Sequence, residues 1–185
     1  MINTYSEYIN RYITNRGLNG AKTPGEHHFV SAYLIPKLFA INGVVPDYIN
    51  PDGTKGIIGD VVYYRDGSHH YGIEVKYETI RLTKNEFNSW IVNEETSDHP
   101  NLFIGIGTEG IIILSWHDFR NAYIASTNIT DLAPIVSGYG PQKSVNTLYN
   151  AGNGITGYLP KADNETESNQ YESQFIQLLQ DAINR

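Results

Sequence analysis

The sequence predicts an α/β or α+β domain in which helices flank a central mixed β-sheet. The chain has 185 residues, of which 40% are hydrophobic, and this suffices for one domain with a substantial core. Its apolar segments follow the order helix, three strands, helix, strand, strand. An Asp-Gly pair between the second and third predicted strands is typical of a β-hairpin, so part of the sheet should be antiparallel.

Two helices are predicted from capping boxes, in which a threonine is followed three residues later by a glutamate. The first box is Thr23-Pro24-Gly25-Glu26, with proline at the first helical position, and Pro36 should kink or split the helix that follows. The second box is Thr83-Lys84-Asn85-Glu86. The buried face behind it is formed by three apolar residues, Phe87, Trp90 and Ile91. Further helices are expected over 5–14, 117–123 and 170–183.

Five strands are predicted from short runs of β-branched and aromatic residues that end in turn residues. They cover 44–49, 57–64, 71–77, 102–106 and 111–114. From about Ser126 onward the periodic pattern weakens, and no long periodic segment follows until the terminal helix. We therefore expect one domain over 1–185, with a core at about 23–123 and a C-terminal extension at about 126–185.

Composition and charge limit the classes of function. The lack of cysteine excludes disulfides, zinc–thiolate sites and thiol nucleophiles. The net charge of −7 argues against a generally basic nucleic-acid binder, although bound cations would offset acidic groups at a metal site. No segment has the apolar length of a membrane span, and the N-terminus lacks the layout of a signal peptide. We therefore expect a cytoplasmic (intracellular) protein without a membrane partner.

One predicted strand, 71–77, carries charges at alternate positions in an otherwise apolar segment. Side chains alternate along a strand, so Ile73 and Val75 point to one face of the sheet. Glu74 and Lys76 point to the other face. Because buried charges are costly unless they are paired or bound to a metal ion, these two residues mark a candidate functional site.

Asp60, in the preceding strand, joins this face only if the hairpin loop contains an odd number of residues. We expect a three-residue loop, Arg65-Asp66-Gly67, which places Asp60 opposite Gly72 and diagonal to Glu74. Two carboxylates and an ammonium held together can bind a divalent cation and activate water, so the pattern predicts a metal-dependent phosphodiesterase site. The alternative is an exposed edge hairpin that carries an ordinary Lys–Glu pair on its outer face.

The segments Gly59-Asp60 and Ile73-Glu74-Val75-Lys76 resemble the motif of the PD-(D/E)xK nuclease superfamily, which includes restriction endonucleases and archaeal Holliday junction resolvases. The similarity extends to residues 81–87, the segment that opens the helix after the lysine strand. It covers about half of the chain, from about 23 to 114. Gly59 stands where the superfamily usually has proline. The resemblance implies a restriction endonuclease-like fold and a DNA endonuclease of the resolvase-like or restriction-like kind.

The resemblance also implies a role for each residue of the motif. Asp60 and Glu74 would bind Mg²⁺, with Mn²⁺ as a substitute, and the main-chain carbonyl of Val75 would be a further ligand. Lys76 would orient or deprotonate the attacking water and neutralise the charge that develops on the phosphate. In-line attack would leave a 5′-phosphate. Glu26 is the candidate for an additional catalytic acid, although its place in a capping box explains it equally well.

DNA is the expected partner, and a homodimer is expected because cutting both strands of a symmetric substrate suits paired active sites. Lys84, at a helix N-terminus, and His70, on the predicted face of Glu74, are candidate contacts to nucleic acid. Two alternatives stay open: a nuclease acting on RNA or free ends, and a non-catalytic nuclease-fold protein that binds nucleic acid or serves in assembly. A polysaccharide-processing enzyme fits less well, because its paired carboxylates would not need Lys76 beside Glu74.

Overall fold

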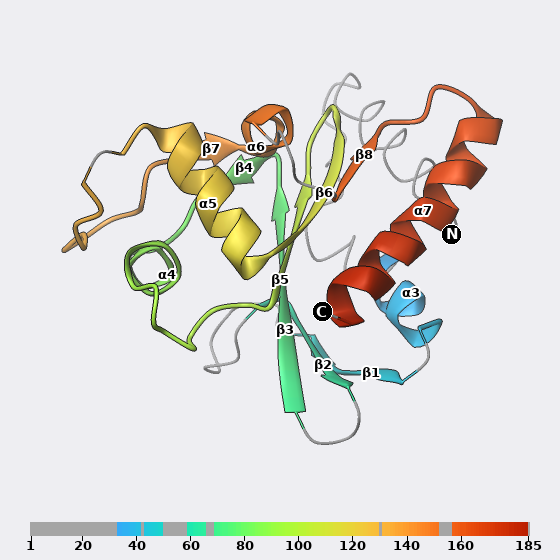
Figure 1. The fold of residues 1–185 in the computed structure, drawn as a ribbon, viewed down its shortest axis with the longest axis horizontal. Helices are drawn as coiled ribbons and strands as arrows, with labels where there is room; N and C mark the ends of the chain where they lie inside the picture. The colour runs from blue at the N-terminus through green and yellow to red at the C-terminus, as the bar shows by residue number, and fades with distance from the viewer. Residues whose placement is uncertain are drawn as a thin grey trace, which may run out of the picture.

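The computed structural model describes residues 33–41, 43–49, 59–65, 69–129, 131–151 and 157–184. These residues form three layers, with a mixed β-sheet between two groups of helices (Figure 1). The strands of this sheet lie in the order β1 (Val44–Ile49), β2 (Val61–Arg65), β3 (His69–Tyr77), β5 (Leu102–Ile106), β6 (Gly110–Ser115) and β8 (Tyr158–Pro160). The predicted mixed sheet flanked by helices is confirmed.

One pair of neighbouring strands in the described sheet is parallel, and the other pairs are antiparallel. β1, β2 and β3 form an antiparallel meander, and β5 is parallel to β3. β6 and β8 then continue the sheet antiparallel to their neighbours. A second, two-stranded sheet is formed by β4 (Thr79–Ile80) and β7 (Lys143–Ser144).

Helices cover both faces of the main sheet (Figure 1). One face is covered by α3 (Ile35–Phe39) and α7 (Glu165–Asn184). The other is covered by α4 (Lys84–Glu86), its π-helical continuation η2 (Phe87–Val92), α5 (Trp116–Thr127) and α6 (Val145–Ala151). Among the helices of the described residues, none is both long and apolar enough to cross a membrane.

Each face of the sheet has its own apolar core. On the α7 face, Ile73 and Val75 of β3 are fully buried with Phe175. On the opposite face, the ring of Phe103 stacks on that of Phe119 with centroids 4.0 Å apart. Because β3 and β5 are buried on both faces, their sequences are nearly continuous apolar runs, and the charges in β3 depart from that rule.

The predicted strands and helices agree with the structure to within a few residues. β1 and β5 have the predicted bounds, whereas β3 begins two residues earlier and β6 extends one residue at each end. β2 covers 61–65, and part of the predicted span 57–64 lies outside the described residues. The predicted helix 5–14 and the first capping box also lie outside them. Pro36 lies in the first turn of α3, directly after a π-type turn.

The second capping box is confirmed at the start of α4. Thr83 Oγ1 accepts a hydrogen bond from the N–H of Glu86 at 3.4 Å, and Glu86 Oε2 accepts one from the N–H of Thr83 at 2.7 Å. The helix predicted over 117–123 is longer, because Ser115 Oγ caps it through the N–H of Asp118. It ends at Asn128, which adopts the left-handed conformation common after helices.

Residues after 126 contribute to the sheet and to both cores. β8 adds a strand next to β6, and α6 places Val145 and Leu148 in the core beneath α5. Phe175 and Leu179 of α7 are completely buried against the opposite face of the sheet. The C-terminal part of the chain therefore packs on the same sheet as the preceding elements.

Arg120 is a buried cation that joins α5 to the end of η2. Its side chain is 6% exposed, and its Nε donates a hydrogen bond of 2.8 Å to the carbonyl of Ile91. Its Nη1 lies 2.5 Å from the carboxylate of Glu94, which is 69% exposed. The guanidinium therefore satisfies a carbonyl at a helix end, where carbonyls lack intrahelical donors.

Replacing Arg120 with methionine should lower the free energy of unfolding by about 2 kcal/mol, because the buried carbonyl of Ile91 loses its charged donor. Glu94→Gln is the matched control and should cost less than about 1 kcal/mol, since the ion pair that it removes is exposed on one side. Urea unfolding of the three proteins measures both effects. Equal losses in the two variants would assign the stabilisation to the ion pair instead of the hydrogen bond.

Candidate active site

The register of the β2–β3 hairpin determines which residues share a face. Val61 pairs with Ile73 and Arg65 pairs with His69, so three residues, 66–68, connect the strands. The predicted odd loop length is confirmed, but the loop begins one residue later than Arg65, because Arg65 is itself paired in β2. The conformation of 66–68 lies outside the described residues.

This shift changes the partner of Asp60. The paired register ends at Val61 and Ile73, and the N–H of Asp60 bonds to the carbonyl of Ile73 at 2.7 Å, so Asp60 lies beside Ile73 and not opposite Gly72 as the predicted loop required. The charge of Asp60 acts on Glu74, and Asp60 Oδ2 accepts the N–H of Val75, so the two carboxylates lie near each other.

The charged residues lie in the interior of the sheet. β3 is bordered by β2 and β5, and Glu74 pairs with Phe103 while Lys76 pairs with Gly105. The cluster consequently faces the side of the sheet covered by α4 and η2. Glu74 is 5% exposed. The alternative of an exposed edge hairpin is therefore wrong.

Two contacts hold the cluster together. The N–H of Val75 donates a hydrogen bond of 2.7 Å to Asp60 Oδ2. Lys76 Nζ forms an ion pair with Glu74 Oε1, and the side chain of Lys76 is 14% exposed. Because the N–H and C=O of one residue in a strand point to the same side, the carbonyl of Val75 is directed toward the side on which Asp60 lies.

Gly59 allows the chain to place Asp60 against β3, directly before β2 begins at Val61. Its φ of +105° is a backbone conformation that side chains of L-residues rarely adopt, and a Cβ there would lie 2.6 Å from the carbonyl oxygen of Ile73. Proline cannot occupy this position, because its ring fixes φ near −65°. Glycine at this position is thus explained by the local backbone. The next residue, Asp60, donates its N–H to the same carbonyl of Ile73 at 2.7 Å.

The pKa of Glu74 is raised from 4.5 to about 8, and burial is the largest cause. The ammonium of Lys76 acts in the opposite direction, by attraction and by a hydrogen bond, whereas the negative charges of Asp60 and Glu86 contribute to the rise. A carboxyl group with this pKa is poised between its two protonation states near neutral pH, and such groups concentrate at functional sites. A cation placed between Asp60 and Glu74 would offset the repulsion and favour the ionised form of Glu74.

The raised pKa predicts a specific dependence of stability on pH. The folded protein binds the proton of Glu74 more tightly than the unfolded chain, so the free energy of unfolding should fall as the pH rises from 4.5 to about 8 and then stay level. The slope contributed by this group is of order 1 kcal/mol per pH unit. Glu74→Gln should lack this contribution and gain stability relative to the native protein across that range. Urea unfolding in EDTA from pH 5 to pH 9 measures it, and parallel profiles for the two proteins would contradict it.

The donor set fits a hard divalent cation that keeps part of its hydration. The described residues contain no cluster of three or more histidine, aspartate or glutamate side chains. Among the described residues, Asp60, directly before β2, and Glu74 of β3 supply two carboxylates. Mg²⁺ is commonly bound by one or two carboxylates and retains several waters, and carbonyl oxygens such as that of Val75 suit it as well.

Comparison with known protein families, curated proteins and solved structures finds no match to this chain. Function is therefore inferred from the geometry of Asp60, Glu74 and Lys76.

Three further residues are predicted from the sequence to belong to the site: Lys84, His70 and Glu26. Lys84 is exposed at the start of α4, but its N–H donates to the carbonyl of Gly138 at 3.1 Å and the N–H of Glu86 bonds to Thr83. These helix N–H groups are thus already engaged, and an anion contact would depend on the Lys84 ammonium. His70 lies in β3 opposite Tyr64, and its side chain is outside the described part of the structure. Glu26 is likewise outside it.

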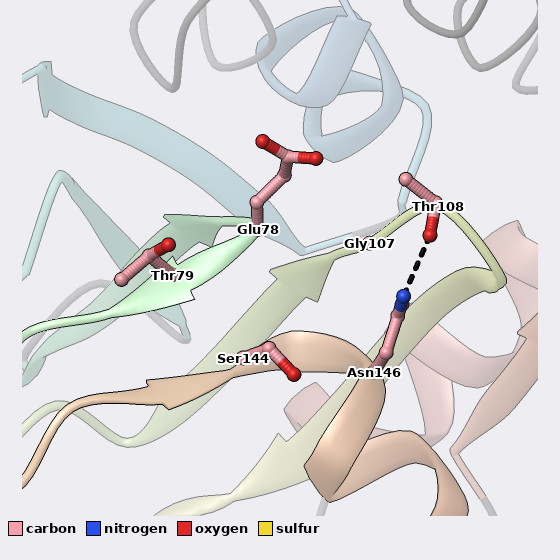
Figure 2. A pocket seen from close by; sticks show the side chains of 6 residues that line it. All are labelled: Glu78, Thr79, Gly107, Thr108, Ser144 and Asn146. Carbon is pink, nitrogen blue, oxygen red and sulfur yellow. Dashed lines mark hydrogen bonds between the residues drawn. The ribbon is translucent and has the colours of Figure 1, made fainter.

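A polar pocket of about 270 Å³ lies beyond the C-terminal ends of β3 and β5 (Figure 2). The pocket is not predictable from the sequence, because part of its lining comes from 144–146, where the periodic pattern is weak. Asn146 donates a hydrogen bond of 2.6 Å to Thr108 and accepts one of 3.3 Å from the N–H of Glu109. Ser144 is hydrogen-bonded to Thr147. Because these groups bond to one another, they join the β5–β6 turn to α6, and we assign them a structural role.

Proposed function

We propose that this chain is a Mg²⁺-dependent DNA endonuclease with a restriction endonuclease-like fold. The observation that carries the proposal is the cluster formed by Asp60, directly before β2, with Glu74 and Lys76 of β3: Asp60 accepts the N–H of Val75, and Lys76 is ion-paired to Glu74. A buried charged cluster costs free energy unless its charges are paired or bound to a metal ion, and a cation between the two carboxylates would offset that cost.

The order of elements supports the fold assignment. A helix, an antiparallel meander of three strands, a helix and a strand parallel to the third follow one another from α3 to β5. This is the order that the resemblance to the nuclease superfamily implies. The proposed site lies on the second and third strands of that meander, as the motif requires.

Each residue of the cluster has a role in the proposed reaction. Asp60 and Glu74 would hold the cation, and the N–H of Val75 fixes one oxygen of Asp60 so that the carboxylate keeps its orientation. When bound, Mg²⁺ supplies charge stabilisation and a reactive water. The Nζ of Lys76 would orient that water and offset the negative charge that develops on the phosphate.

The proposed reaction is hydrolysis of a phosphodiester bond. The oxygen of water forms a bond to phosphorus, the bond from phosphorus to the 3′ oxygen breaks, and that oxygen takes up a proton. The products are a 5′-phosphate and a 3′-hydroxyl. Cleavage of both strands at one symmetric position would require two copies of the chain related by a two-fold axis.

A cleavage assay tests the proposal. The purified protein is incubated with duplex, single-stranded and four-way-junction DNA in Mg²⁺, in Mn²⁺ and in EDTA, with matching RNA substrates as a comparison. We expect DNA cleavage in both metals, with 5′-phosphate ends, and none in EDTA. Failure to cut any substrate, together with a lack of Mg²⁺ and Mn²⁺ binding by calorimetry, would refute the endonuclease and favour a non-catalytic nuclease-fold protein.

A further inference from the structure

The loop of residues 131–142 contacts the start of α4 and carries an exposed aromatic residue, Tyr139. Tyr139 forms a β-bridge with Thr83, and the N–H of Gly140 donates to the carbonyl of Leu82 at 2.9 Å. Nearer the start of the loop, the side-chain amide of Asn88 exchanges two hydrogen bonds of 2.9 Å with the backbone of Ile135. The ring of Tyr139 is therefore presented by a backbone that is fixed to the helix.

The surface around this ring combines aromatic, apolar and cationic groups. Tyr139 is 52% exposed, and Val136, three residues earlier in the same loop, is 89% exposed. The guanidinium of Arg81 lies over the ring of Tyr139, with Cζ 3.8 Å from its centroid. Arg81 and Lys84 are both exposed. These four residues are called the Tyr139 platform below.

We propose that the Tyr139 platform binds an unpaired nucleotide of the DNA substrate, with the base stacked on the ring and the neighbouring phosphates near Arg81 and Lys84. Unstacked bases are recognised by exposed aromatic rings and guanidinium planes, and phosphates are recognised by arginine and lysine. The inference rests on the proposed nuclease function and deepens it. Its consequence is a preference for single-stranded or branched DNA over continuous duplex.

The platform is connected to the proposed catalytic cluster through α4. Tyr139 is bridged to Thr83, and the capping box links Thr83 to Glu86. α4 continues into η2, and Phe87 of η2 lies in the same apolar core as Phe103, the register partner of Glu74. The platform is therefore joined to the side of the sheet on which the cluster lies.

The composition of the platform favours a nucleic acid over a protein partner. Its apolar part consists of two side chains, Val136 and Tyr139. Each side of a stable protein interface contributes about 20–30 residues in all, and the platform has four. Its two cations stand out in a chain whose net charge is −7. Clustered cations beside an exposed ring match the chemistry of a single strand, which offers phosphates and base faces together.

Binding of a fluorescent single strand tests the inference. A DNA oligonucleotide with one 2-aminopurine is titrated with the full chain in EDTA, and anisotropy and 2-aminopurine emission are recorded. We expect binding to quench the emission, because stacking on Tyr139 quenches the base. Tyr139→Leu should lose the quenching and bind about tenfold more weakly, whereas Tyr139→Phe keeps the ring and should behave like the native protein.

Phe39→Leu is the matched control, because Phe39 is another exposed aromatic, 64% exposed, on α3 at the opposite face of the sheet. It should bind as the native protein does, and circular dichroism verifies that all variants are folded. Equal binding by the native protein and Tyr139→Leu would overturn the inference and leave the platform as a contact for a protein. If quenching depends on Tyr139 but the protein does not cleave DNA in Mg²⁺, the nuclease function alone is refuted. If the protein cleaves DNA and Tyr139→Leu cleaves it at the same rate, the role of the platform alone is refuted.

Discussion

Lys76→Ala and Asp60→Asn should each reduce Mg²⁺-dependent DNA cleavage by about 10³-fold. Removing Lys76 takes away the ammonium that is paired with Glu74 and that would offset charge on the phosphate. Asp60→Asn removes a carboxylate charge but keeps an oxygen that can accept the N–H of Val75, so the start of β2 should stay in place. Single-turnover rates on an end-labelled substrate measure the loss, and circular dichroism reports whether the fold is retained.

Lys161→Ala controls for the loss of a positive charge. Lys161 is exposed and follows β8, so its removal lowers the net charge by the same amount without touching the cluster. Its cleavage rate should equal that of the native protein. If Lys161→Ala were as defective as Lys76→Ala, the defect would report weaker attraction of DNA by the whole surface. Cleavage that survives both Lys76→Ala and Asp60→Asn would refute the assignment of the site.

The elements that the sequence predicts well are those specified by local chemistry. β5 is a run of apolar residues between turns, and its bounds, Leu102–Ile106, are those predicted. The capping box at Thr83 and Glu86 depends on side chains three residues apart, so its geometry is contained in the sequence. The parity of the hairpin loop is also predictable, because a slip of one residue would turn Glu74 and Ile73 to the wrong faces.

The features that the sequence does not predict depend on distant partners. β8 is three residues long, contains Pro160 and is a strand only because β6 offers it an edge. The exact register of the hairpin depends on whether Arg65 pairs with His69, a choice that the packing of both strands decides. The position of Tyr139 follows from a bridge to Thr83, more than fifty residues earlier in the chain. None of these has a periodic pattern from which it could be inferred.

Gly59→Ala should lower the free energy of unfolding by at least about 2 kcal/mol and cleavage by about 10²-fold. An alanine at φ +105° is strained, and its Cβ would meet the backbone carbonyl of Ile73 at 2.6 Å. β3 is held between β2 and β5, so the neighbour cannot easily move, and the start of β2 must shift instead. Because Asp60 is the next residue, the shift displaces the carboxylate from Glu74. Urea unfolding and single-turnover cleavage measure the two effects.

Gly138→Ala separates the two causes of that destabilisation. Gly138 also has a positive φ, +80°, but a Cβ there would meet nothing within 4 Å. Its alanine variant should therefore lose only the conformational part, about 1 kcal/mol. A larger loss in Gly59→Ala would then measure the clash with β3. If both variants lost the same stability and Gly59→Ala still cut DNA at the native rate, the close approach of Gly59 to Ile73 would not be what positions Asp60.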